Sequence, residues 1–438
     1  MHLTTAPAAA TKSPTPALIE PREDRNWWIF LAVCLLLGAT LRLVFPTDIE
    51  YKADERYSMS AVEQFRQSGA IPAVGMPSST GVVNAGPSVW IFLLLGSMSG
   101  ASNPAELARS VAVLNILALA ILAAIAIRVL PPEQRAIWGW TAALFCVNVF
   151  AVLFARKIWP QCVEPFFTAL LILAWFHRSR RAAAFCWGVL EALLGQFHMA
   201  GFFFAAALLL WTLAFDRRRE RGLGMQWKYA VTGMCLGAVP MIPWLAHGLH
   251  SSARQAWTQL LGLPFWFAWL RTPLGLGLDY NLGWQYKEFL SWPKIGSHAT
   301  YAVFACMAIT VGTVAVMGAV LLRRRKNDKI SWADLVGLGS ETTFLEAAGL
   351  WGAGLLLSAA AVRIYPHYLI AMFPLPWIWV ARLGTATGRG GRLGLAAIWL
   401  CQLLLSACFL YYIHVHHGAW WGDFGVSYGY QINNGLPR

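Results

Sequence analysis

Residues 27–57 read WWIFLAVCLLLGATLRLVFPTDIEYKADERY, an apolar run that ends in a dense group of acidic and basic residues. The apolar part, Trp27–Phe45, has 19 residues, about 28 Å as a helix, which is enough to cross the hydrocarbon core of a bilayer. It is longer than the core of a signal peptide and lacks a cleavage site, so we interpret it as an uncleaved first span. Residues 1–26 are rich in Ala, Thr and Pro, and we expect them to form a disordered cytoplasmic tail.

Apolar runs of this kind recur along the chain. Of the 438 residues, 58% are hydrophobic and 13% are charged, with a mean hydropathy of +0.52, which excludes a soluble globular protein. We predict an all-α polytopic membrane fold with about eleven transmembrane helices in one domain, 27–413, followed by an outer-face tail, 414–438. The predicted spans are residues 27–45, 106–130, 136–154, 162–177, 183–198, 201–215, 228–247, 300–322, 343–362, 367–382 and 393–413.

Basic residues exceed acidic ones, which gives a formal net charge of +13 at pH 7. They form no single patch and occur as short runs between apolar segments, at 178–181, 217–221 and 323–326. This is the positive-inside pattern, so the charge indicates orientation and no nucleic-acid partner is expected. We predict a multi-pass protein of the bacterial inner membrane with a cytoplasmic N-terminus. The eight cysteines form no CxxC pair and predict neither a disulfide framework nor a metal site.

The first outer loop, Pro46–Asn103, begins with the acidic residues of the quoted stretch. Asp54 is a suitable N-cap for a helix at the membrane surface, and the apolar side of that helix would include Tyr57, Ala61, Val62 and Phe65. Residues 86–95 are apolar but too short to cross, and Pro87 can start a helix there. We therefore expect two interfacial helices in this loop.

Three further features are less specific. The spans 183–198 and 201–215 nearly abut, so they can form a hairpin. The loop 248–298 is rich in Trp and Phe, which suit both the membrane interface and sugar rings. The tail carries His414, His416 and His417, but no carboxylate or Cys at ligand spacing accompanies them, and Gly422-Asp423-Phe424-Gly425 is similar to a kinase motif only by chance.

An acidic pair a few residues after the first span, followed by an interfacial helix, resembles the signature of the GT-C glycosyltransferases. These polytopic enzymes take a sugar from a polyprenyl-phosphate carrier, and the similar branch includes the protein O-mannosyltransferases and the lipid A aminoarabinose transferases. ARKIWPQ at 155–161 and RIYPHYL at 363–369 are further matches. The resemblance covers residues 27–385 as an order of elements. One departure is that the proline-proline stretch usual in the first loop is Asn84-Ala85-Gly86-Pro87 here.

The resemblance implies an inverting, metal-independent glycosyltransferase that needs no cofactor besides its polyprenyl-phosphate sugar donor. It makes Asp54 the base on the acceptor hydroxyl, with Glu55 as its neighbour. Cations are also needed on the leaving phosphate. The candidates for binding the donor phosphate are Arg156 and Lys157, with Arg363, His367 and His198 as secondary candidates. The acceptor hydroxyl can belong to a glycan, a lipid or a protein, on the outer, periplasmic face.

The residues alone leave simpler interpretations open. Acidic residues at a helix start stabilise the helix dipole, and outer-face cations often anchor to lipid head groups. A lone histidine such as His198 is usually packed and hydrogen-bonded. Glu191 lies deep in a predicted span and is a functional hypothesis by default. The alternative function is a transporter or lipid flippase, although no internal repeat is visible; a third is an inactive scaffold that binds polyprenyl lipids.

Overall fold

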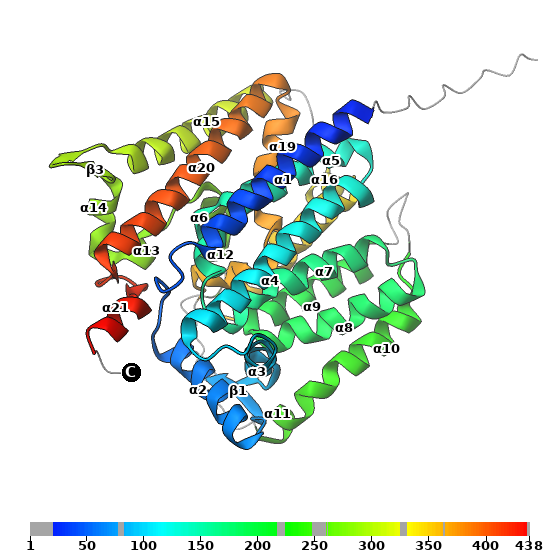
Figure 1. Cartoon of the computed structure of the whole chain (residues 1–438). Helices are drawn as coiled ribbons and strands as arrows, with labels where there is room; N and C mark the ends of the chain where they lie inside the picture. The colour runs from blue at the N-terminus through cyan, green and yellow to red at the C-terminus, as the bar shows by residue number, and fades with distance from the viewer. Residues whose placement is uncertain are drawn as a thin grey trace, which may run out of the picture.

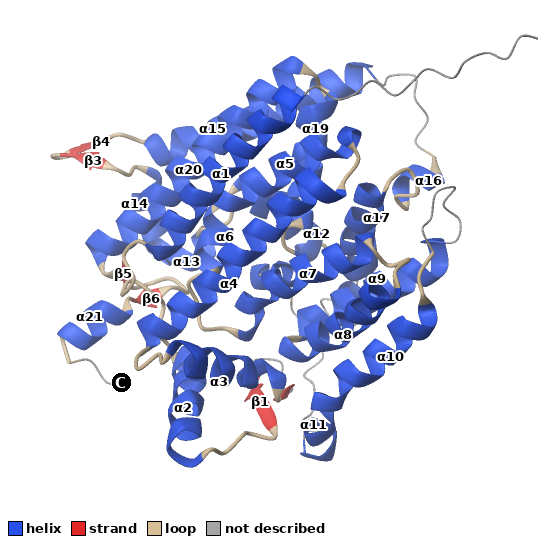
Figure 2. Ribbon diagram, turned by 45° about the vertical axis from the view of Figure 1, so that its right-hand side comes forward, coloured by secondary structure: helices blue, strands red, loops and turns tan. Residues whose placement is uncertain are grey.

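The computed structural model describes residues 21–77, 83–216, 224–247, 260, 262–324, 331–361 and 364–435. Helices dominate this part of the chain, as predicted, and its strands form three small two-stranded antiparallel sheets, β1–β2, β3–β4 and β5–β6. Figure 1 shows the long helices running side by side, and Figure 2 shows how little strand there is.

The elements are bounded as follows. The α-helices are α1 (Pro21–Leu43), α2 (Ala53–Ser68), α3 (Pro87–Ser99), α4 (Pro104–Ala124), α5 (Pro132–Val147), α6 (Val149–Phe154), α7 (Glu164–Phe176), α8 (Arg181–Phe197), α9 (Met199–Phe215), α10 (Trp227–Ala238), α11 (Ile242–His247), α12 (Pro264–Arg271), α13 (Asp279–Leu282), α14 (Tyr286–Leu290), α15 (Ala302–Arg324), α16 (Trp332–Leu335), α17 (Glu341–Ala347), α18 (Gly354–Ala359), α19 (Ile378–Ala386), α20 (Arg389–His416) and α21 (Tyr428–Asn433). The π-helices are η1 (Ile125–Val129) and η8 (Ala348–Ala353), and the 3-10 helices are η2 (Pro160–Val163), η4 (Val239–Met241), η6 (Thr272–Leu274), η7 (Gly283–Gln285), η9 (Pro366–Met372) and η10 (Leu375–Trp377). The strands are β1 (Val74–Pro77), β2 (Val83–Ala85), β3 (Lys294–Ile295), β4 (His298–Ala299), β5 (Gly418–Ala419) and β6 (Gly425–Val426).

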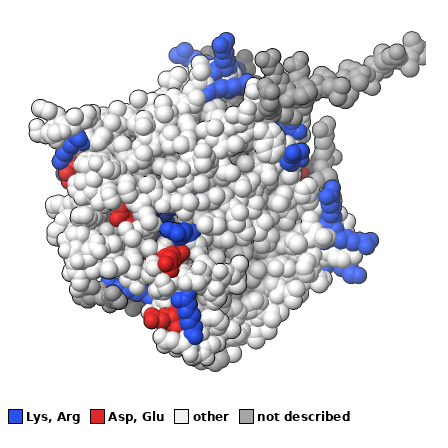
Figure 3. Space-filling view, in the orientation of Figure 1, with Lys and Arg blue, Asp and Glu red and all other residues white. Residues whose placement is uncertain are grey.

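Five of the described helices are long and apolar enough to cross a membrane, or six if η9 and η10–α19, which meet at 93°, form one span. Large apolar side chains on these helices are exposed, for example Leu36 at 68% and Leu322 at 75%. Figure 3 shows a broad surface without charged residues between charged edges. Exposed apolar helices of this length indicate an integral membrane protein, because the exposure of such a large apolar surface to water is energetically unfavourable.

The predicted count of eleven spans is not confirmed, although each predicted span falls on helical residues. One cause is Asn148, whose side chain accepts the backbone N–H groups of Phe150 and Ala151 at 3.0 and 3.3 Å. This caps α6 and separates it from α5, so the predicted span 136–154 is two helices. The first span also differs, since α1 begins at Pro21, within the predicted tail. Residues 1–20 of that tail lie outside the described residues.

Residues 46–103 contain two helices, α2 and α3, where two interfacial helices were predicted, and Pro87 is the first residue of α3 as predicted. The predicted cap of α2 was wrong, but most of its predicted face packs inward, since Val62 is buried and Ala61 and Phe65 pack against the core. Its N-cap is Lys52, and Glu55 accepts the Lys52 backbone N–H at 2.9 Å. The buried residues of α2 are Glu55, Ser58, Met59 and Val62, while Tyr57 is exposed. The buried side of α2 thus includes the carboxyl group of Glu55, whereas the Tyr57 ring lies outside it.

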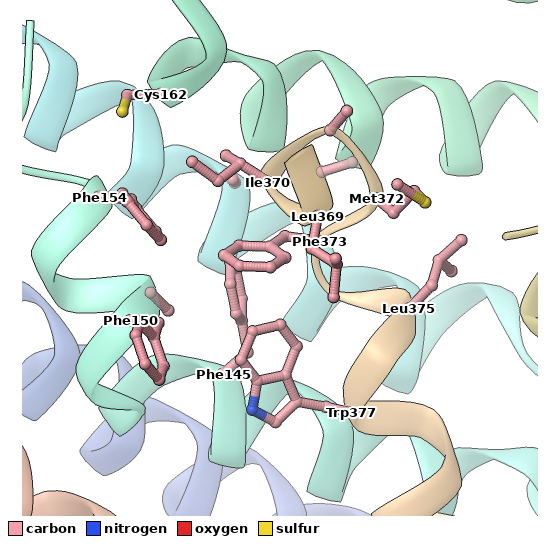
Figure 4. Close-up of a cluster of buried hydrophobic side chains, with 14 of the residues drawn as sticks. Phe145, Phe150, Phe154, Cys162, Leu369, Ile370, Met372, Phe373, Leu375 and Trp377 are labelled. Carbon is pink, nitrogen blue, oxygen red and sulfur yellow. The ribbon is translucent and has the colours of Figure 1, made fainter. Parts of the chain in front are cut away.

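An aromatic core holds η9 in place beside α5 and α6 (Figure 4). The Phe145 ring lies 5.6 Å from that of Phe373 and 5.0 Å from that of Trp377. The Thr168 hydroxyl donates to the carbonyl oxygen of Ala371 at 2.7 Å. Aromatic pairs at these distances add specific attraction to their apolar burial. These contacts fix the position of η9, which begins at Pro366.

Candidate active site

A cavity of about 550 Å³ opens where α2, β1, β2, α13 and η9 approach the tail after α20. In Figure 1 α2, β1 and α3 lie together at the end of the molecule opposite the start of α1. The cavity combines charged, aromatic and imidazole side chains. Its lining residues are Lys52, Ala53, Asp54, Glu55, Met76, Pro77, Asn84, Trp159, Pro160, Gln161, His198, Tyr280, Tyr365, His367, Tyr368 and Asp423.

Asp54 and Glu55, the predicted catalytic pair, both line this cavity. Asp54 is exposed, whereas Glu55 is fully buried. Glu55 uses one carboxylate oxygen on the Lys52 backbone N–H, and its other oxygen has no hydrogen-bond partner among the described residues. The two neighbours therefore have different roles. The Asp54 carboxylate is accessible to a ligand, whereas the Glu55 carboxylate caps the start of α2.

The environment raises the pKa of both carboxyl groups. Burial, with the charge of Glu50 in second place, raises the pKa of Glu55 to about 8. Partial exclusion of water raises the pKa of Asp54 above its ordinary range, against the opposing attraction of Lys52 and Lys157. Glu55 is thus largely protonated at neutral pH, and Asp54 is the better candidate for a base.

Lys52 is the cation that lines the cavity, and sequence reasoning missed it. Its ammonium group lies 2.5 Å from Glu50 and 3.3 Å from the Oδ1 atom of Asp423, and it also donates to the Asp423 carbonyl oxygen. Burial opposes the charge of Lys52, but Glu50 and Asp423 outweigh that effect and raise its pKa. Its side chain remains 36% exposed, so the ammonium can still reach a ligand.

Asp423 belongs to the tail after α20, and it too was not predicted. The tail folds back over the beginning of the first loop. The N–H of Tyr428 donates to the Ile49 carbonyl at 3.0 Å, and residues 50 and 427 form an isolated antiparallel bridge. The Asp423 N–H donates to the Tyr280 carbonyl oxygen at 3.1 Å. These contacts bring a carboxylate from the last part of the chain to the residues that follow the first span.

Lys157, predicted to bind phosphate, lies directly behind the cavity. Its side chain is only 1% exposed and pairs with Glu50, with Asp423 at 3.9 Å. Its ammonium also lies 3.9 Å from the centre of the Trp159 ring, a favourable cation–π distance. The structure therefore groups Lys157 with the predicted carboxylates, but as a buried charge beneath them.

Arg156 is not brought to the cavity. Its guanidinium donates to five backbone carbonyls, those of Leu41, Arg42, Val44, Phe45 and Asp48, at 2.5 to 3.4 Å. The last carbonyls of a helix lack partners within that helix, and a buried cation is a good replacement. Arg156 thus fixes the end of α1 and the residues that follow it. Because its N–H groups bind these carbonyls, few of them remain to bind a phosphate.

His198 and His367 both line the cavity and lie next to each other. Their ring centres lie 6.1 Å apart, and His367 stacks on Tyr365 at 5.4 Å. The Nδ1 atom of His198 accepts the Ala200 N–H at 3.2 Å, so a neutral ring carries its proton on Nε2. His198 sits between α8 and α9, as the predicted hairpin requires. Arg363, the remaining candidate, lies outside the described residues.

The tail histidines have separate partners. His414 lies 2.7 Å from Asp48, His416 lies 2.9 Å from the Tyr412 carbonyl, and His417 stacks on Tyr430. Within the described ranges, no group of three or more His, Cys, Asp and Glu side chains is arranged to hold a metal ion.

Comparisons with known proteins give distant structural similarity only. No protein-family model matches the chain, and no curated protein matches it. The oligosaccharyltransferase of Archaeoglobus fulgidus in its apo form is 12% identical, with a TM-score of 0.42, over 87% of this chain and 56% of that one. The archaeal oligosaccharyltransferase AglB from Archaeoglobus fulgidus, in complex with an inhibitory peptide and a dolichol-phosphate, is 11% identical, with a TM-score of 0.42, over 88% of this chain and 56% of that one. ArnT from Cupriavidus metallidurans in the apo state is 13% identical, with a TM-score of 0.39, over 88% and 78%. The chain thus spans little more than half of the first two proteins.

Proposed function

We propose that this protein is a membrane glycosyltransferase of the GT-C type, which moves a sugar from a polyprenyl-phosphate donor to an acceptor hydroxyl. One observation carries the proposal. The exposed Asp54 carboxylate and the Lys52 ammonium, two residues apart at the start of α2, line the same cavity. Sugar transfer from a lipid phosphate needs a base and a cation in one place.

In the proposed reaction Asp54 takes the proton from the acceptor hydroxyl. The acceptor oxygen then attacks the anomeric carbon as the bond from that carbon to the phosphate oxygen breaks. The sugar leaves with inverted configuration, and polyprenyl phosphate departs with the bonding electrons. Lys52 stabilises the charge that develops on the departing phosphate. The raised pKa of Asp54 makes it a stronger base for this step.

Proton transfer also lowers the negative charge around the cavity during this step. Glu50, Asp54 and Asp423 supply carboxyl groups there, and Lys52 and Lys157 supply ammonium groups. Burial raises the pKa of Glu50 against the attraction of the two lysines. When Asp54 takes the proton of the acceptor, the group loses one negative charge, and its repulsion of the leaving phosphate decreases.

The aromatic wall supports a sugar substrate. Trp159 lies 5.6 Å from the ring of His367, and His367 stacks on Tyr365 with an angle of only 6° between the rings. Flat rings pack on the apolar faces of a sugar, while a Nε2–H group of His198 can bind a hydroxyl or a phosphate oxygen. We place this cavity on the outer face of a bacterial inner membrane, with the N-terminus in the cytoplasm.

The test is Asp54→Asn in purified, lipid-reconstituted protein, with transfer from a radiolabelled polyprenyl-phosphate sugar as the readout. We expect at least a hundredfold loss of transfer, as for the removal of other general bases. Asp48→Asn is the matched control, because Asp48 is in the same loop but pairs with His414 and does not line the cavity. Transfer by Asp54→Asn at the rate of Asp48→Asn would disprove the assignment.

The 93° bend between η9 and η10–α19 favours the alternative of a transporter or flippase, since broken helices are common in such proteins. Vesicles with fluorescent polyprenyl-phosphate lipid distinguish the two functions. A transporter would move the lipid across the bilayer without any sugar acceptor. It would also leave the sugar on the lipid, both in the unmodified protein and in Asp54→Asn.

A further inference from the structure

Three neutral polar side chains from separate segments of the chain line the candidate active site. Gln161 belongs to η2, His198 joins α8 to α9, and Tyr368 belongs to η9. All three line the cavity, and none of them is more than 8% exposed. The rings of His198 and Tyr368 lie 5.3 Å apart, and η2 packs against η9. The fold thus gathers three buried polar groups at one cavity.

The polar atoms of these side chains are unpaired and yet open to the cavity. The amide group of Gln161, the Nε2 atom of His198 and the hydroxyl group of Tyr368 have no hydrogen-bond partner among the described residues. They retain accessible surface, in contrast to the carboxylate oxygens of Glu191, which are fully enclosed. Buried polar groups in folded proteins nearly always have a partner. Three such groups without one, in a single cavity, indicate a binding site for a polar ligand.

The backbone that carries Gln161 is held on both sides. The Ser58 hydroxyl, from α2, donates to the Ile158 carbonyl at 3.3 Å. The Asn115 amide, from α4, donates to the Cys162 carbonyl at 2.9 Å. Gln161 therefore has a fixed position relative to α2, the helix that carries the candidate base. A side chain on a fixed backbone can select a ligand by the position of its polar groups.

The hydrogen-bonding character of these groups matches hydroxyls better than ions. The Gln161 amide and the Tyr368 hydroxyl each donate and accept, whereas a neutral His198 ring donates from Nε2 because Nδ1 accepts the Ala200 N–H. A phosphate or carboxylate would use only the donors, and an ammonium group would use only the acceptors. A sugar hydroxyl both donates and accepts. Several hydroxyls on one sugar ring can therefore satisfy all three groups.

The charged side chains of the cavity do not favour a charged sugar. In the proposed reaction Lys52 meets the phosphate and Asp54 takes the proton of the acceptor. A carboxylate on the sugar would compete with the phosphate for Lys52, and an ammonium group on the sugar would pair with Asp54 and weaken it as a base. Asp423 already pairs with Lys52. An uncharged sugar avoids both effects.

We propose that Gln161, His198 and Tyr368 bind the sugar of the donor, and that this sugar is uncharged and carries free hydroxyl groups. This rests on the proposed function and names the class of sugar that is moved. Gln161 is the specificity-determining residue, because its amide has two N–H donors and an acceptor oxygen on one fixed side chain.

Binding of synthetic undecaprenyl-phosphate sugars to the purified, unmodified protein tests this, without an acceptor and by native mass spectrometry with competition. The neutral probes carry glucose, mannose or galactose, and the charged probes carry glucuronic acid or 4-amino-4-deoxyarabinose. Undecaprenyl methyl phosphate is the sugar-free probe, since it is also a phosphate diester. We expect one neutral probe to bind at least tenfold more tightly than both charged probes and the sugar-free probe. A charged probe that binds most tightly, or no gain from any sugar, would overturn the proposal.

Variants of Gln161 separate recognition from folding. Gln161→Leu should weaken binding of the preferred neutral probe about tenfold and leave binding of the sugar-free probe unchanged. Gln161→Glu has the same shape but only accepts, so it should shift the preference at least tenfold towards the amino sugar. A purely structural role would not produce that shift. Unchanged preferences in both variants would refute the role of Gln161.

Gln196→Leu is the matched control. Gln196 is also buried, but its amide donates to the Ala192 and Gly237 carbonyls at 2.7 Å each, and it does not line the cavity. This variant should keep the sugar preference of the unmodified protein. Loss of the preference in Gln196→Leu as well as in Gln161→Leu, with equal falls in melting temperature, would assign the effect to folding and contradict the proposal.

The sugar site and the proposed function can fail separately. If the sugar-free probe binds but no sugar adds affinity, the sugar site is wrong and the proposed function survives. If none of the lipids binds, both are wrong. If a neutral sugar is preferred as expected but Asp54→Asn keeps full transfer, the sugar site is correct and the catalytic assignment fails.

Discussion

The ammonium nitrogen of Lys52 lies 3.3 Å from the Oδ1 atom of Asp423, although 371 residues separate them in sequence. Lys52 also lies 2.5 Å from Glu50, so one cation joins the first loop to the tail. The carboxylates on either side hold the ammonium at the cavity rather than in solvent. In the proposed reaction Lys52 stabilises the leaving phosphate, so the position of its ammonium group should affect the rate as well as its charge.

Asp423→Asn should lower sugar transfer roughly tenfold, by about 1.4 kcal/mol, because Lys52 loses one of two charged partners. A double-mutant cycle with Lys52→Met measures this coupling. Lys52→Met should abolish most transfer, and Asp423→Asn should add little to it. Asp279→Asn is the control, since Asp279 is exposed in the nearby α13 and does not line the cavity. Fully additive losses in the double variant would contradict a shared role.

Glu55→Gln should change how stability depends on pH. Folding raises the pKa of Glu55 from its ordinary value of 4.5 to about 8. Between these values the folded state holds a proton that the unfolded state has lost, so stability falls as pH rises, by up to roughly 1.4 kcal/mol per pH unit. Glutamine keeps an acceptor for the Lys52 N–H but cannot ionise. Thermal unfolding of the detergent-solubilised protein from pH 5 to pH 9 should show the variant gaining stability over the unmodified protein as pH increases. A constant difference between the two proteins would rule this out.

Arg156→Lys should destabilise the protein without weakening the affinity for the donor. The guanidinium serves five carbonyls at the end of α1 and beyond it, and a lysine ammonium with three donors leaves at least two of them unpaired. We expect a loss of roughly 2 kcal/mol or more, seen as a lower melting temperature. Lys52→Met should differ by weakening donor binding, and it should also lower the melting temperature because the buried Glu50 carboxylate and Asp423 lose a charged partner. A large fall in donor affinity for Arg156→Lys at an unchanged melting temperature would instead restore Arg156 as a phosphate ligand.

His198→Asn separates the two nitrogen atoms of the imidazole. Asparagine can still cap α9 through its side-chain oxygen, as Nδ1 of His198 does by accepting the Ala200 N–H. It does not place a donor at the Nε2 position. We expect a severalfold increase in KM for the donor with a melting temperature close to that of the unmodified protein. His198→Ala should raise KM similarly and also lose about 1 kcal/mol of stability with the cap. An unchanged KM in both variants would limit His198 to a structural role.

Hydropathy placed the helices well but missed their interruptions. The period and length of apolar runs depend on local sequence, so every predicted span fell on helix. The break at Asn148 depends on a side chain that accepts two N–H groups in its own next turn, and a single polar residue in an apolar run does not show that geometry. One long helix and two short helices joined by a break therefore have the same composition, and hydropathy does not distinguish them.

The candidate site was predicted only where its residues are close in sequence. Asp54 and Glu55 follow the first span directly, so their position after it was a usable signal. Lys52 looked like an ordinary loop cation among acids, and Asp423 had no local pattern that would connect it with residue 52. Arg156 and Lys157 are adjacent, yet one side chain turns to backbone carbonyls and the other to Glu50. Neighbouring residues in a loop point in different directions, and only the packed structure decides which.

The position of Asp423 beyond α20 also links the site to the biogenesis of the protein. The ribosome makes Glu50 and Lys52 early, but their partner from the tail follows the last long helix. A nascent chain that has inserted only its first helices therefore carries an acidic loop whose lysine is not held in place. Such an intermediate would be a poor catalyst for any donor lipid it met. In the proposed mechanism, activity would then begin only when the whole bundle has assembled.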